Sequence, residues 1–308
     1  MISNKQPILI SIVGPTAIGK TALSLQLAQH FNTEIISADS RQFYKEMSIG
    51  TAAPTPSELA QAPHHFIHHL SVDTYYNVGD FEKDAMDTIN ELHKTHQVVI
   101  MVGGSGLFVD SVTKGLDDLP KVNMELREEL NKRHQTEGLE PLQLQLKTLD
   151  PKAYETIAID NPKRVIRALE VCLSSGLTYT SFLKKEDKPR PFKTITIGLT
   201  ADRQIIYDRM KQRVDHMIDV GLMLEVKLLY SKKHLNALNT VGYKELFRYL
   251  DNECSLEEAI SEIKKNTRRF AKRQLTWFKK NKEIIWFDYK TGITQVISTL
   301  ESILPNLK

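Results

Sequence analysis

One short stretch near the amino terminus constrains the fold more than any other part of the sequence. The segment GPTAIGKT, residues 14–21, matches the pattern G-x-x-x-x-G-K-[ST], in which backbone N–H groups surround a phosphate and the lysine neutralises it. An apolar run, ILISIV at residues 8–13, precedes the loop, and residues 20–31 after it have the apolar spacing of a helix. A strand, a phosphate-binding loop and a helix in this order predict an α/β fold.

Further apolar runs separated by segments of helical pattern extend this prediction to the whole chain. They are nearly continuous in apolar character, as strands buried on both faces are, and they lie at residues 34–37, 98–102, 194–199 and 283–287. We therefore expect a P-loop parallel sheet flanked by helices. About 90 residues between the third and fourth runs contain no strand pattern, which is too long for a simple crossover. We expect a P-loop catalytic core of residues 1–117 and 191–308, and a helical insertion domain of residues 118–190.

The composition excludes several classes of protein. Hydrophobic residues make up 41% and charged residues 26% of the 308, which is an ordinary globular balance. Cys172 and Cys254 are far apart and in no metal-binding spacing, so we expect neither a disulfide nor a zinc site. No run approaches the roughly 18 apolar residues of a membrane span. We expect a cytoplasmic protein that does not bind a membrane.

Positive charge is concentrated near the carboxyl end of the chain. Residues 264–282 contain nine lysines and arginines and no acid, although the net charge of the whole protein is only +3. Because a solvated helix face normally mixes charges of both signs, this segment favours a surface that binds a polyanion. The alternative is a helix whose charges only keep the protein soluble.

The phosphate-binding loop lacks the partner that ATP hydrolysis needs. P-loop ATPases hold Mg²⁺ with an acid at the end of a neighbouring strand, but the run VVIMVGG ends in two glycines. An acid follows the second strand instead, at Asp39 in SADSRQFY. Because ligands bind beyond the carboxyl ends of parallel strands, we expect Gly14, Asp39 and Ser105 to meet in one crevice. There Asp39 and Gln42 could bind the edge of a base, unless Asp39 caps the following helix.

The order and spacing of nine motifs resemble those of the bacterial tRNA dimethylallyltransferases, also called tRNA isopentenyltransferases. The motifs are GPTAIGKT, SADSRQFY, SIGTAAP, PHHF, YNVGDF, VGGSGLF, NPKRVIRALEV, VGYKE and TRRFAKRQLTWF. The resemblance covers most of the chain, from about residue 8 to residue 287. The resemblance implies transfer of a dimethylallyl group from dimethylallyl diphosphate to N6 of the adenine 3′ of the anticodon in tRNA, with release of diphosphate. A diphosphate that leaves intact needs an anion site and Mg²⁺ but no hydrolytic water, which agrees with the missing acid.

The resemblance also implies roles for the catalytic candidates. Asp39 would accept the N6 proton or orient the amine, and Ser105 would contact the tRNA near the reacting atoms. Arg209 and Arg213, four residues apart, would close on the diphosphate, whereas a surface helix with acidic partners is the alternative. Lys20 would neutralise the diphosphate and the Thr21 hydroxyl would bind the Mg²⁺ cofactor. The expected diphosphate loop comprises Gly14, Pro15, Thr16, Ala17, Ile18, Gly19, Lys20 and Thr21.

A larger set of candidates would bind the tRNA anticodon stem-loop. The target adenine must leave the base stack, and protein contacts must offset the cost of unstacking. Basic side chains would contact phosphates and Trp277 would stack on a base, although an amphipathic helix that buries Trp277 is equally compatible with the pattern. The expected tRNA-binding residues are Asp39, Ser40, Arg41, Gln42, Ser105, Arg127, Lys163, Arg164, Arg167, Gly242, Tyr243, Lys244, Lys272, Arg273, Gln274 and Trp277. We expect dimethylallyl diphosphate as the other partner and a monomeric protein.

Two features are weaker. His64, His65, His68 and His69 could suggest a metal site, but they lack carboxylate or thiolate neighbours in the sequence, so we expect packing and hydrogen bonding instead. In VGGSGLF the resembling family usually has Thr at Ser105 and Tyr at Phe108, so one hydroxyl is kept and the other is lost.

Two other functions are compatible with the loop. An adenine-nucleotide prenyltransferase would need neither the insertion nor the basic segment. A P-loop small-molecule kinase would need only the loop and a Mg²⁺ site. Binding of dimethylallyl diphosphate without binding of ATP separates the kinase from the other two.

Overall fold

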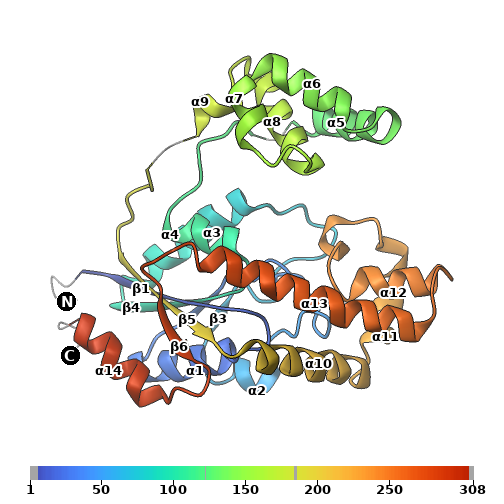
Figure 1. The fold of residues 1–308 in the computed structure, drawn as a ribbon. Coiled ribbons are helices and arrows are strands. Elements are labelled where there is room, and N and C mark those ends of the chain that lie inside the picture. The colour runs from blue at the N-terminus through green and yellow to red at the C-terminus, as the bar shows by residue number, and fades with distance from the viewer. Residues whose placement is uncertain (1–5, 122, 184–185, 305–308) are drawn as a thin grey trace. The chain divides into compact units, whose positions relative to one another are not determined.

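The computed structural model describes residues 6–121, 123–183 and 186–304 (Figure 1). The chain divides into two compact units, one of Met1–Lys114 with Pro189–Lys308 and one of Gly115–Lys188. The sequence pattern placed the corresponding boundaries after residues 117 and 190. None of the helices in the described ranges combines the length and the apolar character needed to cross a membrane.

A six-stranded parallel sheet forms the centre of the first unit. Its order is β3-β2-β4-β1-β5-β6. The strands are β1 (Ile8–Val13), β2 (Ile35–Ser37), β3 (His64–His65), β4 (Val98–Val102), β5 (Lys193–Thr200) and β6 (Ile285–Asp288). The prediction of a parallel sheet is confirmed, and all five expected strands are present. The short β3 was not expected, because two histidines do not form an apolar run.

Helices cover both faces of this sheet, because alternate residues of each strand belong to different cores. In β1, Leu9 and Val13 pack on one face, whereas Ile10 and Ile12 pack on the other. The first face is covered by α3 (Val78–Leu92) and α4 (Gly106–Thr113), and the second by α1 (Lys20–Phe31) and α14 (Ile293–Ile303). Both faces of the sheet are therefore buried under helices, as the continuous apolar runs predict.

The rest of the first unit extends beyond the sheet at the side where α10 lies (Figure 1). Its longest helix, α13, has 23 residues and packs against α10 and α12. Ser255 and Glu258 form a capping box that begins α13. The remaining helices of the first unit are α2 (Pro56–Leu59), α10 (Arg203–Asp219), α11 (Leu222–Leu228), α12 (Tyr243–Leu250) and α13 (Leu256–Phe278), with the short 3₁₀ helices η1 (Tyr230–Lys232) and η2 (Asn236–Leu238).

The second unit is helical and has its own core. Its helices are α5 (Met124–Glu137), α6 (Glu140–Leu149), α7 (Pro151–Thr156), α8 (Pro162–Ser175) and α9 (Tyr179–Phe182). Leu130, Leu142, Leu146 and Leu169 are fully buried in this core. A hydrophobic core of this kind is typical of a separate folding unit.

A buried carboxylate in this unit forms ion pairs with two of the residues expected to bind tRNA. Glu170 is fully buried and forms ion pairs with Arg127 and Arg167. Arg167 also donates to the carbonyl of Pro120 at 3.0 Å. Lys163 and Arg164, on the same helix, are exposed. Among the expected contacts in the insertion, Lys163 and Arg164 have the accessible charges, whereas Arg127 and Arg167 stabilise the unit.

Candidate functional site

The loop between β1 and α1 has the backbone of an anion site. Gly14 has φ +142°, and a Cβ there would lie 2.6 Å from the carbonyl oxygen of Leu199 on the neighbouring strand. Gly19, with φ +112°, precedes α1 and provides no side chain to cap it, and the first turn of α1 contains no acid. The free N–H groups at the beginning of α1 therefore point to a position where an anion is stabilised.

Lys20 is held inside this loop by backbone oxygens. Its Nζ donates to the carbonyls of Gly14 at 3.0 Å and Pro15 at 2.8 Å. Burial lowers the pKa of Lys20 to about 8, while the nearby Asp39 carboxylate acts to raise it and Arg213 acts to lower it. A bound anion would favour the charged form of this amine.

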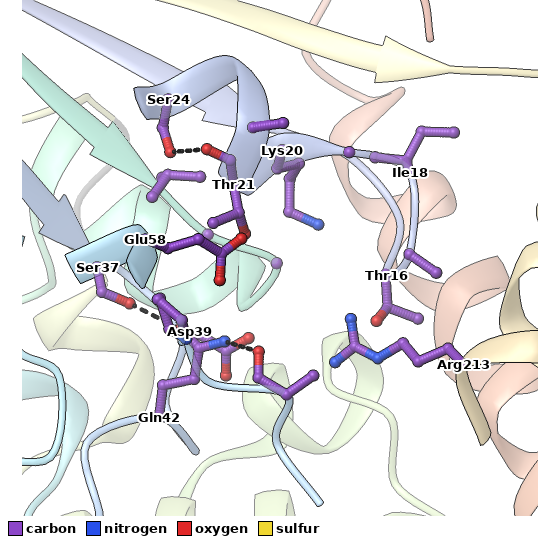
Figure 2. A pocket seen from close by; sticks show the side chains of 18 of the residues that line it. Thr16, Ile18, Lys20, Thr21, Ser24, Ser37, Asp39, Gln42, Glu58 and Arg213 are labelled. Atoms are coloured by element: carbon purple, nitrogen blue, oxygen red, sulfur yellow. Dashed lines mark hydrogen bonds between the residues drawn. The ribbon is translucent and has the colours of Figure 1, made fainter. Parts of the chain in front are cut away.

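The loop lines a cavity of about 290 Å³ together with the ends of the neighbouring strands (Figure 2). Asp39 and Gln42 follow β2, and Gly103 and Gly104 follow β4. Because β2, β4 and β1 are neighbours and parallel, their carboxyl ends lie at one edge of the sheet. The three strand ends therefore lie together as expected, but of Gly14, Asp39 and Ser105 only Asp39 lines this cavity. Ser105 lies beside Ser40, with its hydroxyl 3.2 Å from both the N–H and the hydroxyl of that residue.

Asp39 does not cap a helix. Residues 40–43 form a turn, and the Asp39 carboxylate accepts the N–H of Arg41 at 3.1 Å. One oxygen is therefore used in the turn, while the side chain lines the cavity with Lys20 and Arg213 (Figure 2). The capping alternative for Asp39 is wrong, because no helix follows it.

Arg209 and Arg213 both line the same cavity from α10. Arg209 Nε donates to the carbonyl of Ala17 at 2.7 Å, and its guanidinium lies 5.3 Å from the ring centre of Tyr289. Arg213 donates to the carbonyl of Thr51 at 3.0 Å, and burial lowers its pKa. In the described part of the chain neither arginine forms an ion pair with a carboxylate, so the alternative of a salt-bridged surface helix is wrong.

A second cavity, of about 310 Å³, shares four residues with the first. The shared residues are Thr16, Asp39, Arg213 and Phe270. Its other walls include several residues expected to bind tRNA, namely Ser40, Arg41, Ser105, Gly242, Lys244 and Arg273. Asp39 thus lies where an anion-binding cavity meets a cavity lined by hydroxyl groups and cations.

Two expected tRNA contacts have other roles in the structure. Tyr243 is fully buried and donates its hydroxyl to Glu225 at 2.6 Å. Gln274 is only 6% exposed, and its amide accepts the N–H of Thr16 and donates to the carbonyl of Gly104, both at 2.9 Å. For Tyr243 and Gln274 we therefore replace the expected tRNA contact with an internal one, because their polar atoms are bonded within the protein.

Trp277 and its neighbours on α13 differ in accessibility. The indole N–H of Trp277 donates to Asp110 at 2.9 Å, and the ring lies where a Cβ on Gly106 would stand. Trp277 is thus packed against α4, as its alternative role predicts. Lys272 and Arg273 are exposed, and the Arg273 guanidinium lies 5.7 Å from the ring centre of Phe270, so α13 presents two accessible cations at the positions expected to bind phosphates.

Sequence reasoning missed several residues that line the cavities, among them Thr51, Glu58 and Phe270. Thr51 contributes its backbone carbonyl, which has no sequence signature. Glu58 begins α2 with Thr55 in a capping box, a pattern that indicates a helix start and nothing more. Phe270 lies within the motif TRRFAKRQLTWF, but only the fold shows that its ring borders both cavities.

His64, His65 and His68 form hydrogen bonds, whereas His69 packs against the rings of Phe43, Phe66 and Tyr76. His64 Nδ1 lies 2.8 Å from the carbonyl of Ala62, and His65 Nε2 lies 2.6 Å from the Glu34 carboxylate. Burial lowers the pKa of His64, His68 and His69. Within the described residues no three His, Cys, Asp or Glu side chains come close enough to hold a metal ion.

Comparisons with known proteins agree with one another. The model of the IPP transferase family matches residues 42–281. A tRNA dimethylallyltransferase of Christiangramia forsetii is 57% identical over 294 residues, which cover 96% of this chain and 97% of that protein. One of Flavobacterium johnsoniae is 53% identical over 306 residues, covering 97% and 98%.

Two solved structures resemble the whole chain. The full-length tRNA isopentenylpyrophosphate transferase of Bacillus halodurans has a TM-score of 0.72 and 37% identity, with 98% of this chain and 97% of that chain covered. A eukaryotic dimethylallyltransferase acting on tRNA has a TM-score of 0.81 and 25% identity, with 97% and 80% covered.

Proposed function

The chain belongs to the IPP transferase family, and from this membership we propose that it transfers a dimethylallyl group from dimethylallyl diphosphate to tRNA. The acceptor is N6 of the adenine 3′ of the anticodon, and diphosphate is released. One observation supports this proposal above all others. Asp39 lies at the junction of an anion-binding cavity and a second cavity with hydroxyl and cationic walls.

The first cavity suits the diphosphate. The N–H groups at the beginning of α1 and the charges of Lys20, Arg209 and Arg213 all border it. These groups are fixed before the substrate arrives, so they need little reorganisation when negative charge grows on the leaving diphosphate.

Mg²⁺ fits the same cavity. The side chains of Thr21, Asp39 and Glu58 line it (Figure 2), and hydroxyl and carboxylate oxygens are the donors that Mg²⁺ prefers. Thr21 would hold the ion with one of these carboxylates. When bound, the ion neutralises charge on the diphosphate.

The second cavity suits the adenine. In the reaction the bond between N6 and the allylic carbon forms while the bond from that carbon to the diphosphate oxygen breaks. The amine loses one proton, and Asp39 accepts it or orients the attacking amine. The loop N–H groups and Lys20 stabilise the developing diphosphate.

The rival functions use only part of this arrangement. A kinase would use the loop and the Mg²⁺ site but would leave the second cavity without a role. A free adenine nucleotide would leave the exposed cations of α13 and of the insertion unused. We also propose that the reaction takes place in the cytoplasm and that a monomer suffices, because one chain forms both cavities.

One experiment tests the proposal directly. The protein is incubated with labelled dimethylallyl diphosphate, Mg²⁺ and total tRNA, and the labelled nucleoside is identified after digestion. We expect the label on N6 of the adenine 3′ of the anticodon. A labelled nucleotide at another position, or transfer of phosphate from ATP in a parallel reaction, contradicts the proposal.

A further inference from the structure

One carboxylate on α11 binds three consecutive backbone N–H groups on a distant loop. Glu225 accepts the N–H of Ser48 at 3.0 Å, of Ile49 at 2.8 Å and of Gly50 at 2.9 Å. It also accepts the hydroxyl of Tyr243 at 2.6 Å. Four donors thus meet one carboxylate, and hydrogen bonds to a charged acceptor are about twice as strong as neutral ones.

Tyr243 fixes the same loop by packing as well. A Cβ on Gly50 would lie 2.5 Å from the ring of Tyr243, so the loop backbone rests directly on that ring. Tyr243 is fully buried, and Gly242 before it has φ +98°. The motif VGYKE thus places a rigid aromatic surface beneath SIGT, and the absence of a side chain at Gly50 permits the contact.

The fixed loop ends at a carbonyl group of the candidate site. The carbonyl of Thr51 accepts from Arg213 at 3.0 Å and from the Gln42 amide at 3.4 Å. Arg213 has no carboxylate partner in the described part of the chain, so this carbonyl is the acceptor that orients its guanidinium. A displacement of the 48–51 loop would therefore move Arg213 as well.

We propose that Glu225 and Tyr243 are positioning residues that hold Ser48–Thr51 so that the Thr51 carbonyl orients Arg213 toward the diphosphate. This inference rests on the proposed function of the cavity. Neither residue lines either of the two cavities. Their effect passes through one loop and one backbone carbonyl.

The substitution Glu225→Gln tests the carboxylate with little change of volume. The amide brings an NH₂ group against N–H donors that need an acceptor, so the loop loses part of its attachment. We expect the affinity for inorganic pyrophosphate with Mg²⁺, measured by calorimetry, to fall by about tenfold, the effect of one lost charge-assisted contact. The apparent KM for an anticodon stem-loop should change by less than about twofold.

Two further variants separate positioning from general destabilisation. Tyr243→Phe keeps the ring beneath Gly50 and removes only the hydroxyl, so it should fold and show a smaller loss of pyrophosphate affinity. Glu46→Gln is the matched control, because Glu46 also accepts from a loop, at Ser71 and Val72, whereas in the described part of the chain no hydrogen bond joins it to residues 48–51. It should leave pyrophosphate affinity unchanged.

A double-mutant cycle decides whether Glu225 acts through Arg213. If it does, Glu225→Gln should lower pyrophosphate affinity by less than about twofold in an Arg213→Ala background, because the group that it positions is gone. Equal losses in both backgrounds overturn the inference. A wild-type protein that binds pyrophosphate but transfers nothing to tRNA contradicts the proposed function instead, so the two failures are distinguishable.

Discussion

The cations of the candidate site are held by carbonyl groups rather than by carboxylates. Lys20 bonds the carbonyls of Gly14 and Pro15, Arg209 bonds that of Ala17, and Arg213 bonds that of Thr51. A carbonyl dipole orients a cation but leaves its net charge intact. The protein thus keeps several positive charges close together. Burial lowers the pKa of Lys20 and of Arg213, and the charge of Arg213 acts to lower that of Lys20 as well.

The lowered pKa of Lys20 predicts a pH dependence of anion binding. Its charged form is present below about pH 8 and is lost as the pH rises through that value. We therefore expect pyrophosphate affinity to weaken above about pH 8, by up to about tenfold per pH unit. The Lys20→Met variant should bind pyrophosphate weakly, and its affinity should lack the decrease above about pH 8 that comes from Lys20. The ligand's own titration occurs with both proteins, so equal pH profiles would contradict the prediction.

The same lysine predicts how stability changes with pH. Between about pH 8 and its ordinary value of 10.5, the unfolded chain keeps the proton that the folded protein has lost. The contribution of Lys20 to the free energy of unfolding therefore rises with pH across that window. The difference between wild type and Lys20→Met in urea unfolding should show this sign.

Asp39→Asn tests proton acceptance with little change of shape. We expect the single-turnover rate of transfer to fall by about 10²–10⁴, as for a lost acid–base group, while tRNA binding falls much less. Rapid-quench measurements and a filter-binding assay separate the two quantities. An unchanged rate would assign Asp39 to the turn alone, where it accepts the N–H of Arg41.

The long helix α13 combines two tasks on different faces. Gln274 faces inward and links the phosphate loop to the end of β4, whereas Lys272 and Arg273 face outward. Adjacent positions on a helix point in different directions, so in the sequence KRQ, residues 272–274, the first two side chains can face solvent while the third is buried. In this motif Gln274 therefore stabilises the fold, whereas Lys272 and Arg273 are accessible to a polyanion.

Gln274→Glu tests the inward face. The carboxylate can still accept from Thr16, but it cannot donate to Gly104 and places a charge in a buried position. We expect a loss of about 1–3 kcal/mol in the free energy of unfolding, measured with urea. Gln212→Glu, at an exposed position of α10, is the control and should change it by less than about 0.5 kcal/mol. Similar effects of both substitutions would contradict the structural role of Gln274.

Lys272 and Arg273 test the outward face. If both contact phosphates, replacing both with Ala should reduce the slope of log K for tRNA against log salt by about 2. The control is Lys94→Ala with Lys211→Ala, because these lysines already pair with Glu91 and Asp208. An unaltered slope in the test variant would assign the α13 cations to solubility.

At the scale of the whole molecule, the residues of both cavities belong to one unit and the insertion has a separate core. The first unit therefore contains the candidate chemistry by itself. The exposed Lys163 and Arg164 of the insertion have no part in either cavity. Under the proposed function, these exposed charges are available to the tRNA, which is much larger than the diphosphate and the adenine.

This division predicts the choice of acceptor. Remote contacts can supply binding energy that extrudes and orients the adenine, and a free nucleotide offers none of them. We expect transfer to an anticodon stem-loop with a kcat/KM at least about 10²-fold above that for AMP. Comparable values for the two acceptors would favour the adenine-nucleotide prenyltransferase.

The sequence by itself determined the features that depend on near neighbours along the chain. The phosphate loop, the apolar strands and the charged face of α13 all follow from local patterns, because backbone preference and burial act over a few residues. The two-residue strand β3 has no local pattern of this kind, because it exists only by pairing with β2, and the sequence therefore did not reveal it.

Only the tertiary structure decided which polar groups face inward. Tyr243 and Gln274 were expected to bind tRNA, yet their partners are Glu225, Thr16 and Gly104, which are distant in the sequence. Gln274 bonds the backbone N–H of Thr16 and the backbone carbonyl of Gly104. Because every residue except proline has both of these groups, the sequence gives no sign of such partners. A polar side chain in a motif therefore shows that a hydrogen bond is needed, and the fold alone determines whether its partner is the protein or a substrate.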